Sequence, residues 1–164
     1  MPIQTTPVHT RADAETIAFL GEVLAVRLTS EQTNGDVGVL EHLLPAGTAT
    51  PLHVQPHESE LFYVIDGRIT VWLDGELTQA ESGDVVWLPR GCAHAFRVDS
   101  EQAHVVGLSL PGGHERFFRL AGEPVSAFDL SAADAAEPDL DRMASAAAQA
   151  GVEILGPPPF DENA

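Results

Sequence analysis

The sequence predicts a mainly β protein, organised as a single jelly-roll β-barrel with a helical appendage at its C-terminal end. Short apolar or alternating segments fill residues 16–110, and Gly, Pro, Asn and Asp mark the turns between them. Turn signals at intervals of roughly eight to twelve residues are typical of a sandwich or barrel, and the jelly roll fits them best. From Pro111 onward the apolar spacing becomes helical.

The composition is that of one soluble globular domain. The chain has 164 residues, of which 44% are hydrophobic and 20% are charged. Its formal net charge of −17 argues against a nucleic acid or an anionic membrane as a partner, because such a field repels phosphates. The N-terminus has no secretory leader pattern, and no segment approaches the ~20 apolar residues of a membrane span. We therefore expect a cytoplasmic protein.

Residues 1–15 are interpreted as a polar N-terminal arm, and the barrel is expected to occupy residues 16–110. Residues 17–29 are rich in apolar and β-branched types, which predicts two strands with a bend at Gly21. Asn34-Gly35 predicts a turn because these residues tolerate a positive φ. The strands expected after this turn cover residues 37–44, 51–55, 60–66, 68–73, 77–80, 85–88, 95–98 and 104–110.

Residues 111–164 predict a helical extension that packs on the barrel as part of the same domain, because it is too short to hold its own core. Helices are expected over residues 114–121 and 140–150, and a glycine follows each of them as an end signal. Between them, Ser131 and Asp134 have the spacing of a capping pair.

The start of this extension is expected to cover the mouth of the barrel cavity. Gly112-Gly113 provides a hinge, and two aromatic residues, Phe117 and Phe118, follow side by side in the first helix. An exposed helix would not display two adjacent phenylalanines without a partner, so they are expected to seal the barrel.

Two glycine-bounded segments carry the residues with chemical potential. The first contains His53, Gln55 and Glu60, and the second places His94 at a fixed offset after a Pro-x-Gly turn. Residues 53 and 55 lie two apart, so an extended chain directs both side chains to one face. Glu60 opens an apolar strand, where an unpaired carboxylate would cost several kcal/mol to bury. Two imidazoles, a carboxylate and an amide that converge in this way form a small-ion site with an open coordination position.

The two segments resemble the paired motifs of the cupin superfamily, G-x5-H-x-H-x3,4-E-x6-G and G-x5-P-x-G-x2-H-x3-N. Two positions depart from the pattern, because Gln55 stands where the second histidine is usual and Val98 where the asparagine is usual. Two segments of the sequence are most similar to small cupins of the quercetin 2,3-dioxygenase-like group. They are P-L-H-V-Q-P-H-E-S-E-L-F-Y-V-I-D-G and, near the C-terminal end, G-V-E-I-L-G-P-P.

This resemblance implies one divalent transition metal in the barrel lumen, which could be Fe, Ni, Mn, Cu or Zn. The expected ligand set is His53, Gln55, Glu60 and His94. Gln55 is the weak member because an amide oxygen is a poorer donor than imidazole for these metals. His57 is an alternative fourth ligand, although its position after Pro56 favours a place in the loop at the rim.

The resemblance also implies roles toward a small-molecule substrate. Glu60 would be both a metal ligand and the catalytic base that accepts the proton of a substrate hydroxyl. Phe62, Phe96 and Val98 would form the apolar surface that holds a planar or aliphatic substrate. His57 would contact the substrate from the rim.

Three functions remain open from the sequence. The first is a metal-dependent, quercetinase-like dioxygenase that acts on an enolisable or phenolic small molecule. The second is an isomerase, cyclase or lyase that uses Glu60 and the histidines as acid and base. The third is a non-catalytic small-molecule binding cupin, because a fold alone does not decide among these activities.

A homodimer is the expected assembly. A barrel of this size leaves strand edges and apolar outer-face residues uncovered, and Tyr63, Ile65 and Trp87 are candidates for such a face. The resemblance agrees, because small bacterial cupins are commonly dimers.

Overall fold

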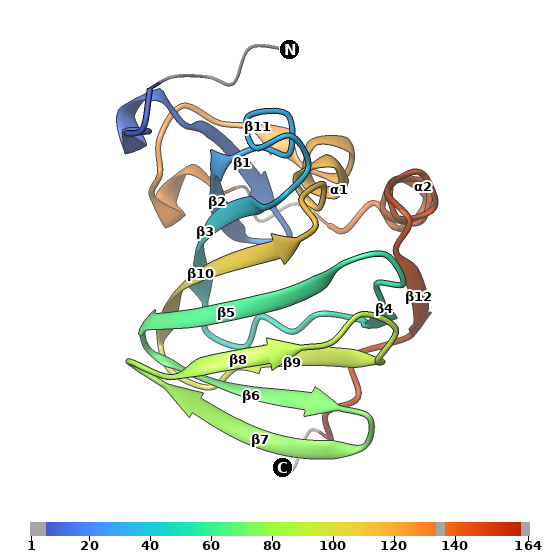
Figure 1. Ribbon diagram of the computed structural model, residues 1–164. Coiled ribbons are helices and arrows are strands. Elements are labelled where there is room, and N and C mark those ends of the chain that lie inside the picture. The colour runs from blue at the N-terminus through green and yellow to red at the C-terminus, as the bar shows by residue number, and fades with distance from the viewer. Residues whose placement is uncertain (1–5, 134–136, 162–164) are drawn as a thin grey trace.

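Figure 1 shows the computed structural model of the protein, which describes residues 6–133 and 137–161. Twelve strands form two antiparallel sheets. In the larger sheet the strand order is β11-β1-β2-β3-β10-β5-β8, and in the smaller it is β12-β4-β9-β6-β7. The larger sheet contains β1 (Glu15–Phe19), β2 (Glu22–Leu28), β3 (Gly38–Pro45), β5 (Ser59–Asp66), β8 (Val85–Leu88), β10 (Gln102–Leu110) and β11 (Glu123–Pro124). The smaller contains β4 (Leu52–Val54), β6 (Arg68–Leu73), β7 (Glu76–Glu81), β9 (His94–Val98) and β12 (Glu153–Gly156).

The closed barrel expected from the sequence is corrected to two open sheets. In the described residues, no hydrogen-bonded strand pair joins one sheet to the other. In the described residues the edge strand β8 of the larger sheet does not pair with the edge strand β7 of the smaller sheet, so the two sheets stay open. Tight turns carry the chain from one sheet to the other. Gly67 has a φ of 92°, and a Cβ there would lie 2.4 Å from the carbonyl oxygen of Gln102. The turn therefore requires glycine, and it sends β5 and β6 to different sheets instead of pairing them.

The main hydrophobic core lies between the sheets. The apolar run of β5 predicts a strand buried on both faces, but only one face is buried: Phe62 and Val64 point into the core while Tyr63 and Ile65 are exposed. Other strands contribute their inward residues in the same way. The buried members of this core are Leu44, Phe62, Val64, Ile69, Val71, Ala80, Leu88, Val98, Ala103 and Val105.

A second core joins the helices to the larger sheet. The helices predicted after Pro111 are confirmed as α1 (Glu115–Ala121) and α2 (Leu140–Ala150). Gly151 ends α2 with a φ of 74°, as the sequence predicts. Phe117 and Phe118 of α1 pack edge-to-face against each other and against Phe19. The buried members of this core are Ile17, Leu24, Val26, Leu40, Phe117, Phe118, Ala146, Ala147 and Val152.

Four short features of the described chain were not expected from the sequence, and one of them is the two-residue strand β11. Short 3-10 turns form at Arg11–Asp13 and Leu130–Ala132, and the side chain of Asp129 caps the second of them. Asp134 of the expected capping pair lies outside the described residues. The strand β12 follows α2 and lies beside β4 (Figure 1). Its pairing with β4 places Ile154 opposite His53. Within the described residues, no helix is long and apolar enough to cross a membrane.

Candidate metal centre

His53 is held in place by the two strands that flank its own strand in the smaller sheet. It lies on β4, between β12 and β9, and is registered directly opposite His94. The Nδ1 atom of His53 lies 2.8 Å from the carbonyl oxygen of Pro51, to which it donates a hydrogen bond in the corresponding tautomer. Its Nε2 atom then carries no proton, and the lone pair of this atom is free. Burial, and after it the charge of His94, lowers the pKa of His53 to about 4, so the ring is neutral at physiological pH.

His94 is oriented in the same way from the neighbouring strand. Its Nδ1 atom lies 3.1 Å from the carbonyl oxygen of Cys92, in the loop that follows the Pro-x-Gly turn. The rings of His53 and His94 are 4.3 Å apart between centroids. His94 is buried, and its Nε2 atom faces the opposite sheet.

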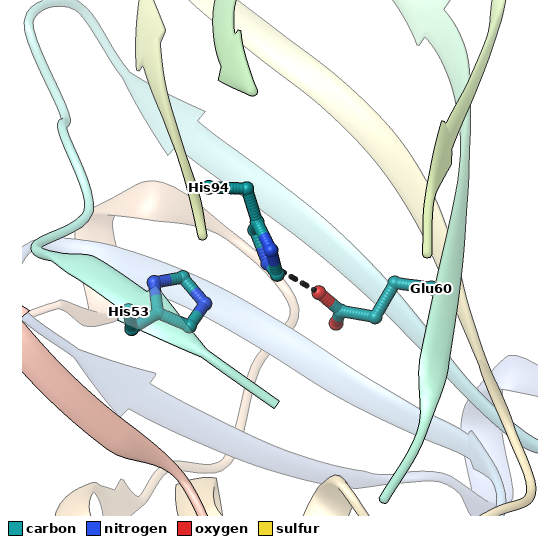
Figure 2. A group of neighbouring side chains, drawn as sticks. All are labelled: His53, Glu60 and His94. Carbon is teal, nitrogen blue, oxygen red and sulfur yellow. Dashed lines mark hydrogen bonds and ion pairs between the residues drawn. The ribbon is translucent and has the colours of Figure 1, made fainter. Parts of the chain in front are cut away.

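Glu60 completes the group from the larger sheet, at the start of β5. Its Oε2 atom lies 3.2 Å from Nε2 of His94, as the dashed line in Figure 2 shows. Ligand atoms of His53, Glu60 and His94 all lie within 4.8 Å of one another. Although burial raises its pKa, the nearby imidazoles of His114, His94 and His53 lower the pKa of Glu60 to about 2.

These three residues fit a divalent metal. Both histidines donate Nδ1–H to a backbone carbonyl, which is the usual arrangement around metal-binding imidazoles because it fixes the tautomer with Nε2 free. The carboxylate is ionised and lies beside one of the free nitrogens. Two imidazoles and one carboxylate suit iron, copper, nickel, manganese or zinc.

A fourth titratable residue lies beside this group and has no spacing signal in the sequence. His114 precedes α1, and its Nε2 atom lies 3.6 Å from Oε1 of Glu60. Its Nδ1 atom lies 3.4 Å from Nε2 of Gln55 and 3.7 Å from Oε1 of Glu58. The one available signal was the position of His114 between the Gly-Gly hinge and the Phe-Phe pair expected to cover the cavity.

The structure separates the two alternatives considered for the fourth ligand from the triad. Gln55 is 1% exposed and does not line the cavity, because β4 ends at Val54 and the two-residue alternation does not continue. The Nε2 atom of Gln55 donates to Glu58, and its Oε1 atom has no partner among the described residues. His57 is exposed, and it packs near Gly151 instead of the cavity.

The metal-candidate residues open onto a cavity of about 320 Å³. Phe62 and Phe96 line it, and their rings meet edge-to-face. Val98 does not line it, because this residue points into the core between the sheets. The segments after Pro111 and the second core also contribute lining side chains, which include Phe19, His114, Phe117, Phe118, Met143, Val152 and Ile154.

A second carboxylate, Glu22, also lines the cavity and lies beside His42. Glu22 is 6% exposed, and its contact among the described ion pairs is Nδ1 of His42 at 3.4 Å. That nitrogen is buried and has no hydrogen-bond partner in the described residues. The sequence contains no lysine, and none of its arginines is among the cavity-lining residues of the described chain. The titratable groups that the described residues contribute to the cavity are therefore two carboxylates and four imidazoles.

Comparisons with known proteins agree with this arrangement. A family model described as "Cupin domain" matches residues 39–110, which include all three triad residues. An uncharacterized protein of Streptomyces coelicolor is 35% identical over 81 residues, which cover 49% of this chain and 73% of that protein. Quercetin 2,3-dioxygenase of Bacillus subtilis is 34% identical over 94 residues, or 57% of this chain, but only 28% of the length of that enzyme is matched.

The fold agrees as well. The solved structure of Pac13, a nucleoside dehydratase from Streptomyces, matches 77% of this chain and 97% of its own with a TM-score of 0.58. Its sequence identity is 18%, so the likeness concerns the fold alone. The two-sheet architecture, the His53–Glu60–His94 triad and the sequence matches lead to one conclusion: the chain is a small member of the cupin superfamily.

Proposed function

We propose that the protein is a metal-dependent dioxygenase of the quercetinase type that acts on an uncharged, hydroxylated aromatic compound. The observation that carries this proposal is the His53–Glu60–His94 triad, which opens onto a cavity lined by aromatic side chains. The quercetin dioxygenase among the relatives supports the same reaction class.

The charge of the cavity favours an uncharged substrate. None of the described arginines lines it, while Glu22 and Glu60 place two carboxylates in its walls. A carboxylate or phosphate group on a substrate would meet these acids without a cationic partner, except at the metal. A phenol or enol instead donates hydrogen bonds to carboxylates. Phe62 and Phe96 offer the edge and face that hold an aromatic ring.

The residues of the chain then have separate tasks. A divalent metal would be held by His53, Glu60 and His94, and it would supply Lewis acidity and one-electron chemistry with dioxygen. Glu60 is ionised, so its carboxylate can accept the proton of a substrate hydroxyl whose acidity the metal would raise. His114, 3.6 Å away, stabilises the ionised carboxylate before the substrate enters. The aromatic lining excludes water from the reacting atoms.

Oxygen uptake with quercetin tests the proposal. Protein purified without a histidine tag or chelator should contain a bound transition metal and should consume oxygen when quercetin is added. Glu60→Gln should lower this rate at least about 100-fold, because it removes both a ligand and the base. His57→Ala is the matched control, since His57 is exposed, and it should retain the full rate. A metal-containing protein that consumes no oxygen with quercetin or other flavonols would contradict the assignment.

One observation favours a second candidate, a cupin isomerase, cyclase or lyase that needs no oxygen. The Glu22–His42 pair faces the same cavity as Glu60, so the site has carboxylate and imidazole groups from two separate positions. Two such pairs can remove a proton at one position and return it at another. The two candidates differ in an anaerobic assay, in which turnover continues for the second and stops for the first.

A further inference from the structure

We infer that Glu22 forms a second polar subsite at the far end of the cavity, where it accepts a hydrogen bond from a hydroxyl group of the substrate. This inference rests on the proposed function, because it concerns how the same hydroxylated aromatic compound is held. It narrows the substrate class to elongated aromatic compounds that carry hydroxyl groups at both ends, one for Glu60 and one for Glu22.

Glu22 differs in its hydrogen bonds from the other buried glutamates outside the metal centre. Its side chain is 6% exposed, yet no group of the described residues donates a hydrogen bond to its carboxylate. Among the described ion pairs its partner is Nδ1 of His42 at 3.4 Å, and this nitrogen has no hydrogen-bond partner among those residues. The comparable glutamates each accept at least one hydrogen bond, and they are Glu41, Glu58 and Glu115.

A buried carboxylate without donors points to a ligand. A carboxylate that leaves water loses its hydration, and a fold compensates this loss when protein donors replace the water. Glu41 receives such donors from the side chains of Arg11 and His104, and Glu115 receives them from two backbone N–H groups. Glu22 has none in the described chain, but it lines the cavity. A hydroxyl group that enters the cavity therefore supplies the missing hydrogen bond.

The strand register places this subsite well away from the metal centre. Glu22 opens β2, and the neighbouring strand β3 carries His42 (Figure 1). Val105 of β10 is registered opposite both His42 of β3 and Val64 of β5. Val64 lies four residues beyond Glu60 on β5. Two strand spacings and four residues give a separation on the order of 15 Å between the Cα atoms of His42 and Glu60. A compound with more than one ring is needed to reach both ends.

The wall between the two ends is aromatic. The ring of His42 meets the ring of Phe118 at a centroid distance of 5.6 Å. Phe118 also meets the ring of His114, whose Nε2 atom lies 3.6 Å from Oε1 of Glu60. Phe118 thus links the Glu22 subsite to the metal centre along the cavity wall. A cavity that is apolar in the middle and acidic at both ends complements an aromatic body with a hydrogen-bond donor at each end.

Anaerobic titration calorimetry with three flavonols tests the inference without turnover. The compounds are quercetin, an analogue without the hydroxyl groups of its outer phenyl ring, and an analogue without those of its benzo ring. One analogue should bind the unaltered protein at least about 10-fold more weakly than quercetin, because it lacks the hydroxyl that reaches Glu22. In Glu22→Leu, this analogue and quercetin should bind equally. Glu76→Leu is the matched control, because Glu76 is exposed on β7, and it should preserve the 10-fold difference.

Thermal unfolding of the same variants separates a binding role from a structural one. A carboxylate kept for a ligand is unfavourable in the empty protein, so Glu22→Leu should unfold at the same or a higher temperature. A lower melting temperature together with an unchanged difference in affinity would make the pair with His42 structural and overturn the inference. Glu22→Gln keeps an acceptor oxygen but loses the charge, so it should give an intermediate difference, and it decides the question should Glu22→Leu fail to fold.

The possible outcomes separate this inference from the proposed function. If the difference in affinity disappears in Glu22→Leu, the inference is supported even when no oxygen is consumed, and the dioxygenase function alone falls. If the difference persists in both Glu22 variants, or if all three flavonols bind the unaltered protein equally, the inference alone is overturned. If the unaltered protein binds none of the three, the inference and the proposed substrate class fall together.

Discussion

Glu41 is a buried carboxylate outside the metal centre, and it is surrounded by basic groups. It lies on β3 with 5% exposure, and His104 Nε2 donates to its Oε1 atom over 2.8 Å when that nitrogen carries the proton. Arg11 forms an ion pair with the same oxygen, and Arg27 lies 3.4 Å from the other. Although burial alone would raise it, the hydrogen bonds from His104 and Arg11 leave the pKa of Glu41 below its usual value of about 4.5. Glu41 therefore connects the N-terminal residues to the larger sheet.

This cluster predicts a pH-dependent contribution to stability. Because the folded state lowers the pKa of Glu41, the stabilisation is fully present above pH ~4.5 and is lost as the pH falls toward the folded value. Glu41→Gln should reduce the free energy of unfolding by about 1–3 kcal/mol at pH 7. Urea unfolding of both proteins from pH 3 to 7 should show a difference that narrows below pH ~4.5. A difference that stays constant across this range would show that the charge of Glu41 is not its cause.

The residues of the metal centre were predictable from the sequence only where spacing carries information. His53, Glu60 and His94 lie on strands whose alternation and turns determine the direction of each side chain. Gln55 was expected on the same face as His53, but that rule ends where β4 ends. His114 comes close to Glu60 through the packing of α1 on the larger sheet, which no local pattern encodes.

Helix α1 forms part of the cavity through its two phenylalanines. Phe117 and Phe118 belong to the second core and line the cavity as well, so the same side chains contribute to stability and to the shape of the site. Their common partner is Phe19 of β1, whose ring they contact edge-to-face at centroid distances of 5.5 and 5.6 Å. A substitution of either phenylalanine is therefore expected to change both the stability of the protein and the shape of the cavity.

Phe118→Ala should lower the free energy of unfolding by about 3–5 kcal/mol, because it leaves a cavity beside Phe19 and His42. Denaturant unfolding measures this loss. Leu140→Ala is the control on α2, where the side chain is 64% exposed, and it should change stability by less than about 0.5 kcal/mol. Equal effects of the two substitutions would mean that Phe118 is not packed in the second core.

Strand β12 shows why the end of the chain was harder to predict than its helices. Helix α2 has an N-cap, an apolar side and a terminal glycine, all of which are local signals. The four residues of β12 have no alternation in exposure, and they form a strand because β4 offers an unpaired edge. Its pairing with β4 encloses His53, so a tertiary contact, not a local preference, completes the site.

The whole molecule consists of two twisted sheets with helices at one end. The sequence pattern was sufficient to predict the position of most of its strands. What the pattern did not determine is whether the sheets close, since closure depends on how edge strands β7 and β8 meet. In the structure, β8 remains an edge strand of the larger sheet. Such an edge is an open site for association, because in the described part of the chain no strand pairs with its outer side.

The outer face beside this edge predicts a homodimer. Tyr63, Ile65, Val85 and Trp87 are 44%, 40%, 59% and 51% exposed, and Tyr63 is registered opposite Val85. These side chains lie on the outer side of β5 and β8, where a second copy of the chain can cover an identical patch across a two-fold axis. The occupant is expected to be a second copy because the patch continues to an edge strand that an identical edge can pair.

Light scattering at micromolar concentration should therefore give twice the mass of the chain, and Trp87→Glu should give the mass of a monomer. The substitution places a charge within the patch, where a dimer would have to bury it unpaired against its own symmetry mate. Leu77→Glu is the matched control, because Leu77 is 55% exposed on β7, the edge strand of the other sheet, and it should leave the dimer intact. A monomeric mass for the unaltered protein would contradict the assembly, and a monomer produced only by Leu77→Glu would move the interface to the smaller sheet.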